Sequence, residues 1–503
     1  MAKEASFQVI VLGPTGGPCE DKVTGILVRS TSTNWSPDSV VAVDAGTMLA
    51  GIIRLLERYI PGSKDDEGIL QEGPFKGLEL PHETAQANAA HVFRELIGTV
   101  LITHPHLDHI SGLAINTPIL EAGSGPKTVA ALPSVLTAIK NHLFNDVIWP
   151  NLSDEDGGAG LLTYQRLVEG GNSRFGTGEG RGYVRACNGL LTKCLSISHG
   201  RCRPRFYPES GTNPRLGSTV FAPDQLLPSR AISVDNADGS LYSPARSPRL
   251  PPSNPKEPLT TTVESSAFFL RDRHTGNEII VFGDVEPDSV SHDPQNKRVW
   301  ETAAPKVASG ILRALFIECS YTDAVNDAYL YGHMCPRHLI AELKVLATQV
   351  MNVRELDNTD QKRKRENSDF ADRDSNVSPR TKRTQSNAGQ RGRRIEGTSE
   401  PRTRSNLRDA FENLSESPSS GYTGYTEGAD PAGDLPTPNP VRWADADPLP
   451  LAGLSVYLIH IKDYMTDGPP ISDQILSELQ AHGKEAHLGC EFFMPNPAEG
   501  IWI

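Results

Sequence analysis

Four potential metal ligands lie within six residues of this chain, in the sequence His104-Pro-His106-Leu-Asp108-His109. They follow the apolar run 99–102, which is typical of a buried β-strand. In a loop that leaves a strand, His104 and His106 can face one cation while Asp108 and His109 reach a second. Two divalent ions roughly 3.5–4 Å apart can bind both the attacking and the leaving oxygen of a phosphoester. We therefore expect a two-metal hydrolase, although histidines in such a turn can also merely cap a strand end.

Three later residues come at the ends of apolar runs and are candidates to complete this site. His199 would give the first cation a third imidazole, Asp284 has two oxygens with which to bridge both cations, and His460 would be the last ligand of the second. Taken alone, each has an ordinary alternative, which is a strand-end or core histidine for His199 and His460 and a turn for Gly283-Asp284.

The elements expected to position these residues alternate between strands and helices. Strand patterns cover residues 7–12 and 40–44, and helical patterns cover residues 47–59, 82–97 and 337–346. Such alternation suits two sheets sandwiched between helices. Gly112, just after the ligand motif, would permit close packing of the loop.

The order of the candidate ligands, His-x-His-x-Asp-His followed by His, Asp and His, is that of metallo-β-lactamase-fold hydrolases. More narrowly, residues 104–118 resemble the signature of class II 3′,5′-cyclic-nucleotide phosphodiesterases, the fungal low-affinity cyclic AMP enzymes with some bacterial relatives. Further segments resemble blocks of that family in the same order, at residues 41–47, 282–288, 317–321 and 331–336. Thr117 stands where the family pattern has Ser. The resemblance extends from about residue 7 to the C-terminus and implies an α/β fold, a metallo-β-lactamase-like αββα sandwich.

This reading implies hydrolysis of a cyclic nucleotide, with cyclic AMP as the expected substrate. We expect a hydroxide held between two divalent metal ions, which are zinc because three imidazoles favour a borderline cation, to release a 5′-nucleoside monophosphate. His333 is the candidate proton donor for the 3′ oxygen, Glu318 is a candidate to orient His333 or a water, and Asp108 is placed with the catalytic residues as well as the ligands. Structural roles at the start of a helix for His333 and at a strand end for Glu318 are the alternatives.

The composition bears on the substrate. The chain of 503 residues has a net charge of −13, whereas proteins that hold long nucleic acids usually present a basic face. A small anion is therefore favoured over a polymer. The basic run at residues 362–365 is the exception, and it fits a nuclear-import signal, an RNA-binding tail or a solvated linker.

Two other functions stay open. One is a different hydrolase with the same fold, such as a tRNA 3′-processing endonuclease. The other is an inactive relative that binds cyclic nucleotide, although such relatives usually lose a ligand and none is missing here.

We expect a single metallo-hydrolase domain over residues 1–503 that carries two inserts. Residues 354–448 are dense in charged residues, Ser, Gly and Pro and have too few apolar residues to form a core, so we expect this segment to be disordered. Residues 222–261 are Pro-rich and are expected to form a long surface excursion. Ser378-Pro379 and residues 383–386 look accessible to kinases. The oligomeric state is not predicted.

The cysteines and the hydropathy indicate a cellular compartment. The seven cysteines form no Cys-x-x-Cys pair, and their odd number favours reduced thiols over a disulfide framework. No apolar run approaches the ~20 residues needed to span a bilayer. We therefore expect a cytoplasmic or nuclear protein that does not bind a membrane.

Overall fold

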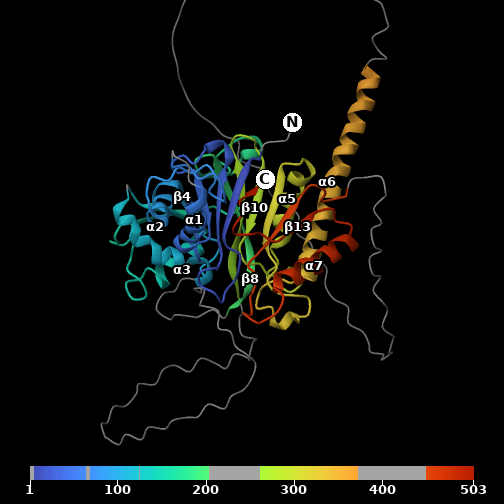
Figure 1. Cartoon of the computed structure of the whole chain (residues 1–503). Coiled ribbons are helices and arrows are strands. Elements are labelled where there is room, and N and C mark those ends of the chain that lie inside the picture. The colour runs from blue at the N-terminus through green and yellow to red at the C-terminus, as the bar shows by residue number, and fades with distance from the viewer. Residues whose placement is uncertain (1–4, 64–67, 124, 203–260, 372–448) are drawn as a thin grey trace, which may run out of the picture. The chain divides into compact units, whose positions relative to one another are not determined.

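The computed structural model describes residues 5–63, 68–123, 125–202, 261–371 and 449–503. Within these ranges, two sheets of seven strands each pack together, with α1, α2 and α3 beside the first sheet and α5, α6 and α7 beside the second (Figure 1). This is the αββα sandwich that the sequence predicts.

The first sheet has the strand order β14-β1-β2-β3-β4-β5-β6. Its strands are β1 (Phe7–Gly13), β2 (Gly25–Ser30), β3 (Val40–Val43), β4 (Ile97–Leu101), β5 (Lys127–Ala131), β6 (Leu162–Arg166) and β14 (Ile501–Trp502). The second sheet has the order β13-β12-β11-β10-β9-β8-β7. Its strands are β7 (Val184–Cys187), β8 (Leu190–Cys202), β9 (Thr261–Asp272), β10 (Glu278–Phe282), β11 (Leu312–Glu318), β12 (Ser455–Ile459) and β13 (Glu491–Phe493).

The helices connect strands within each half of the chain. They are α1 (Leu49–Ser63), α2 (Ala85–His91), α3 (Leu107–Asn116), α4 (Pro133–His142), α5 (Asn296–Ala308), α6 (Pro336–Ala371) and α7 (Ile471–Glu485). No helix in the described part of the chain is long and apolar enough to cross a membrane.

Successive side chains along the strands of the second sheet point to opposite faces, and each face packs into a different core. On β10, Ile279 and Val281 pack into the core between the sheets, while Ile280 and Phe282 pack into the core beneath α5, α6 and α7. Because both faces are buried, the strand is a continuous apolar run in the sequence. This is why β10 could be recognised without a homologue.

Parallel pairing brings several strand ends to one edge of the sandwich. Strands β3 and β4 end at the register partners Val43 and Leu101, and β11 and β12 end at the register partners Glu318 and Ile459. Strand β10 runs parallel to β11 and ends at Phe282. Ligands of open α/β sheets bind beyond the carboxyl ends of such strands, and most of the predicted metal ligands follow these ends. His199 does not, because β8 continues past it to Cys202.

The single helix predicted for residues 82–97 is wrong in part. Helix α2 ends at His91, residues Val92–Leu96 form a π-helical turn, and β4 already begins at Ile97. Ile97 is fully buried and is the register partner of Val40 in β3. Pairing within the sheet thus overrides the helical periodicity at this point.

The prediction that residues 354–448 are disordered is wrong for residues 354–371, because α6 continues to Ala371. The side chains of residues 355–359 are exposed, so this part of the helix adds no core. Its sequence is nevertheless rich in Glu, Gln, Lys and Arg, which are strong helix formers, and this accounts for the continuation of the helix. The rest of that predicted insert, residues 372–448, and residues 222–260 of the Pro-rich insert lie outside the described residues.

Candidate metal centre

The loop after β4 holds the first four predicted ligands against the first sheet. Thr103 and His104 continue from the strand, and α3 begins at Leu107, so Asp108 and His109 lie in its first turn. The backbone N–H of Ala45 donates to the carbonyl of His109 at 2.8 Å. An added Cβ at Gly112 would lie 2.7 Å from the carbonyl oxygen of Ala45, so the close packing expected at this glycine is present.

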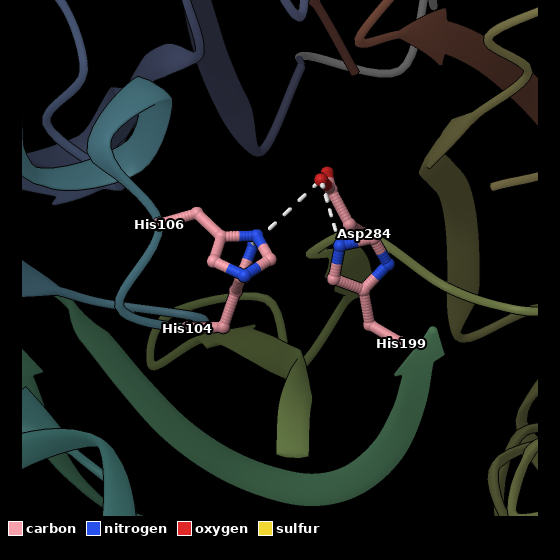
Figure 2. A group of neighbouring side chains, drawn as sticks. All are labelled: His104, His106, His199 and Asp284. Carbon is pink, nitrogen blue, oxygen red and sulfur yellow. Dashed lines mark hydrogen bonds and ion pairs between the residues drawn. The ribbon is translucent and has the colours of Figure 1, made fainter. Parts of the chain in front are cut away.

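A first cluster contains His104, His106, His199 and Asp284, whose ligand atoms all lie within 4.8 Å of one another (Figure 2). The Nε2 atom of His104 lies 2.9 Å from Nδ1 of His106. Nε2 of His104 and Nε2 of His199 each lie 3.6 Å from Oδ2 of Asp284. Three ring nitrogens and one carboxylate oxygen therefore converge on one point, which is the donor set of a tetrahedral metal site.

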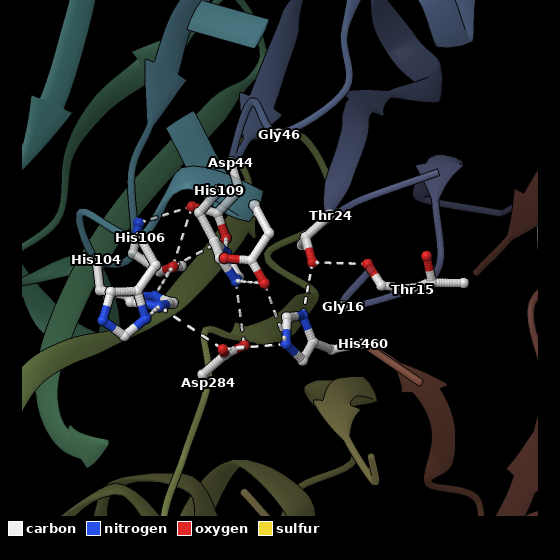
Figure 3. A network of polar contacts seen from close by, with 12 residues as sticks. Thr15, Gly16, Thr24, Asp44, Gly46, His104, His106, His109, Asp284 and His460 are labelled. Atoms are coloured by element: carbon white, nitrogen blue, oxygen red, sulfur yellow. Dashed lines mark hydrogen bonds and ion pairs between the residues drawn. The ribbon is translucent and has the colours of Figure 1, made fainter. Parts of the chain in front are cut away.

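A second cluster contains Asp108, His109, Asp284 and His460, again within 4.8 Å (Figure 3). Nε2 of His109 lies 3.3 Å from Oδ1 of Asp284, and Nε2 of His460 lies 3.1 Å from Oδ2 of the same residue. Both ring nitrogens are fully buried, and their contacts with Asp284 lack the geometry of a hydrogen bond. Buried polar atoms without a partner are costly unless a ligand satisfies them, so the donor set fits a cation.

The other ring nitrogen of each buried histidine is held by the protein. Nδ1 of His109 lies 2.8 Å from Oδ2 of Asp44, and Nδ1 of His199 lies 2.8 Å from the carbonyl oxygen of Gly332. Nδ1 of His460 lies 2.8 Å from Oγ1 of Thr24. Such partners fix the ring orientation, and the acceptors at His109 and His199 also fix the tautomer, leaving Nε2 free to bind a metal.

Asp44 is a functional residue to which the sequence assigned no role. It directly follows β3, and its Oδ1 accepts from the backbone N–H of Thr103 at 2.8 Å while Oδ2 faces His109. The signals were a carboxylate at the end of a buried strand and its place in the block 41–47 that resembles the family. Asp44 and His460 both have a φ of 58°, which is strained for residues other than glycine. Such strain is often found at functional sites.

Burial and neighbouring charges set the protonation of the clustered groups. Burial lowers the pKa of His199 and His106 to about 3 and that of His104 well below its usual value, which favours neutral imidazoles. Burial also acts to lower the pKa of His109, but the carboxylates of Asp284 and Asp44 outweigh it and raise that pKa well above its usual value. A divalent cation bound next to His109 would oppose protonation of this imidazole.

Two predicted catalytic residues form a third group with His199 and Asp284. Nδ1 of His333 lies 3.0 Å from Oε2 of Glu318 and 3.7 Å from Oδ2 of Asp284. Glu318 also accepts a hydrogen bond from the backbone N–H of Val285 at 2.6 Å and one from the hydroxyl of Ser320. Burial, followed by the charge of Asp284, raises the pKa of Glu318 to about 8.

The comparisons with known proteins point to one family. A family model described as class-II cAMP phosphodiesterases matches residues 10–165 and 251–358. The 3′,5′-cyclic-nucleotide phosphodiesterase of Schizosaccharomyces pombe is 26% identical over 349 residues, which are 69% of this chain and 78% of the relative. The 3′,5′-cyclic-nucleotide phosphodiesterase 1 of Saccharomyces cerevisiae is 26% identical over 378 residues, covering 68% of this chain and 83% of the relative.

A solved structure agrees with the fold. The crystal structure of unliganded yeast PDE1 aligns with a TM-score of 0.58 and 18% sequence identity, over 99% of this chain and 100% of that chain. Together with the two-sheet topology, this confirms the metallo-β-lactamase-like sandwich predicted from the sequence. Because the family model matches more than half of the sequence, the chain belongs to the class-II cAMP phosphodiesterase family.

Proposed function

We propose that the chain hydrolyses 3′,5′-cyclic nucleotides, cyclic AMP first among them, to 5′-nucleoside monophosphates at a centre of two zinc ions. The observation that carries the proposal is the pair of four-residue clusters that share Asp284, in a member of a family of cyclic AMP phosphodiesterases. Residues 1–503 would form one catalytic domain with two inserts. All seven predicted ligands are present in the two clusters, which counts against an inactive relative.

His104, His106 and His199 would hold the first ion, Asp108, His109 and His460 would hold the second, and Asp284 belongs to both sets. Zinc suits a site with three imidazoles. When bound, such ions supply positive charge to phosphate oxygens and lower the pKa of water. The side chain of Asp108 is 25% exposed, whereas that of Asp284 is 2% exposed. Asp108 is therefore also able to accept a hydrogen bond from the attacking water.

His333 is the candidate proton donor for the leaving 3′ oxygen. Cleavage of the bond between phosphorus and the 3′ oxygen leaves an alkoxide that must gain a proton. Nδ1 of His333 faces Glu318, and burial raises the pKa of Glu318 to about 8 while it lowers that of His333 to about 3. A protonated Glu318 would donate to Nδ1, which places the proton of the neutral imidazole on Nε2. The 3′ oxygen would take this proton from Nε2 as Nδ1 takes the proton of Glu318. Glu318 holds the ring, and its own position is fixed by Val285 and Ser320.

The direct test is product analysis with purified protein of known metal content. We expect 5′-AMP, and not 3′-AMP, to be released from cyclic AMP by protein that carries close to two zinc ions per chain. Cleavage of a tRNA precursor without hydrolysis of cyclic AMP would instead favour the endonuclease. Binding of cyclic AMP without hydrolysis, at full metal content, would favour an inactive relative.

We further propose that residues 372–448 serve location or regulation, with Ser378 and Ser386 as phosphorylation sites. Replacing these residues by a Gly-Ser linker of equal length is expected to leave the melting temperature and the rate of cyclic AMP hydrolysis nearly unchanged, because the segment has too few apolar residues to form a core. Calorimetry and initial rates would measure this. A large loss of activity in the folded variant would show that the segment contributes to the site.

A further inference from the structure

Lys462 is a cation at the metal centre that the sequence did not single out. It lies two residues beyond His460, and its backbone N–H donates to the carbonyl oxygen of Ser320 at 3.1 Å. Its Nζ donates to the carbonyl oxygen of Gly16 at 2.8 Å and lies 3.6 Å from Oδ2 of Asp108. Among the described residues, it is the lysine or arginine that forms an ion pair with a proposed metal ligand.

The contacts of the ammonium leave donor capacity open. A lysine has three N–H donors, and the carbonyl of Gly16 takes one of them. Oδ2 of Asp108 lies at 3.6 Å, beyond hydrogen-bond distance. A lysine that served only to neutralise Asp108 would be expected to bond to it directly. The side chain of Lys462 is 22% exposed, so a small ligand can reach it.

Gly16 keeps the space next to this ammonium free. An added Cβ at Gly16 would lie 2.6 Å from Nζ of Lys462 and 2.4 Å from Nε2 of His460. Any larger residue would therefore intrude between the lysine and a proposed metal ligand. The glycine thus allows an ammonium and a metal-binding imidazole to face the same small volume, which suits an anionic group held by the ammonium and by the ion that His460 would bind.

We propose that Lys462 binds a non-bridging oxygen of the cyclic phosphate and stabilises the negative charge that grows there during hydrolysis. The proposal rests on the proposed function. A cyclic nucleotide carries one negative charge on its phosphate, whereas the 5′-monophosphate product carries about two at neutral pH. A fixed cation stabilises the transition state most where negative charge develops, because its position is set before the reaction. Lysine binds phosphate as a compact point charge.

The test is Lys462→Met, which replaces the stem of the side chain with one of similar shape and removes the ammonium. We expect kcat for cyclic AMP to fall about 10²-fold, as for the loss of one preorganised donor, with a smaller change in KM. Zinc content and melting temperature should match the wild type. The affinity for 5′-AMP, measured by calorimetry on the zinc-loaded protein, should fall as well. Lys462→Arg should recover part of both, and Lys22→Met, at an exposed lysine near the same N-terminal loop, should change neither.

Three results would overturn the proposal. A wild-type kcat and 5′-AMP affinity in Lys462→Met would remove the lysine from the site. Loss of zinc, with activity restored by added zinc, would show that Lys462 positions Asp108 instead of binding phosphate. Unchanged affinity for 5′-AMP with a lower kcat would exclude a phosphate contact. The binding measurement needs no turnover, so a wild-type protein that fails to hydrolyse cyclic AMP would overturn the proposed function and still leave Lys462 testable.

Discussion

Asp284→Ala is expected to abolish hydrolysis of cyclic AMP and to lower the zinc content from near two ions per chain to well below one. Oδ1 of Asp284 faces His109 at 3.3 Å, and Oδ2 faces His460 at 3.1 Å and both His104 and His199 at 3.6 Å. One substitution therefore removes an oxygen from both clusters. Loss of metal-derived charge stabilisation is worth several kcal/mol, which corresponds to a fall in rate of about 10³-fold or more.

Elemental analysis and initial rates would measure the two effects together. Asp288→Ala is the matched control, because Asp288 lies in the same loop but accepts hydrogen bonds from the backbone N–H groups of Asn296 and Lys297 at the start of α5. It should cost about 1 kcal/mol of stability as a lost helix cap and leave the zinc content intact. Full retention of zinc in folded Asp284→Ala would remove Asp284 from the metal centre.

The grouping of the ligands was predictable because of where they stand in the sequence. Asp284 and His460 directly follow apolar strands whose parallel pairing with β11 brings their ends to one edge. His199 lies within β8, which is antiparallel to β9, and β9 is in turn antiparallel to β10, so β8 ends at the same edge. The structure brings these residues and the His104–His109 motif together in the two sets that the sequence predicts. The strand pattern is strong here because both faces of the inner strands are buried.

The partners that hold the ligands were not predictable in the same way. Thr24 bonds to His460 across 436 positions of sequence, and nothing around Thr24 indicates a site. The contact exists only because β1 and β2 pack beside the loop that follows β12. Lys462 was missed for a related reason, since a lone lysine after a strand is ordinarily a solvated charge. Its position is given by the carbonyl of Gly16, which is a backbone group without a sequence signature.

The errors in the secondary structure have an equally local cause. Residues 92–97 satisfy a helical period, but Ile97 pairs with Val40, and the π-helical turn absorbs the change from helix to strand. Residues 354–371 contain few apolar residues and were therefore expected to be unstructured. Absence of a core argues against tertiary packing, but helix propensity and charged pairs along the chain are still able to support a helix that extends from a packed one.

His333→Ala is expected to slow hydrolysis of cyclic AMP by ~10²–10⁴-fold, as for the loss of a general acid, while sparing a nitrophenyl phosphodiester. The 3′ alkoxide is a poor leaving group that needs a proton, whereas nitrophenolate leaves without one. Glu318→Gln should follow the same pattern more weakly, because Glu318 holds the ring at Nδ1 of His333. His274→Ala, at an exposed histidine, is the control and should change neither rate.

The zinc content of His333→Ala separates the two roles that the geometry allows. His333 and Glu318 lie within ligand distance of Asp284 and His199, so this third group is also a potential metal site. Against that role, Oε1 of Glu318 already accepts from Val285 and Oε2 from Ser320, and His333 bonds to Glu318 through Nδ1. With Nδ1 engaged in this way, Nε2 is the nitrogen left for substrate. Loss of zinc would move His333 into the ligand set, and equal losses on both substrates at full zinc content would leave it a positioning residue.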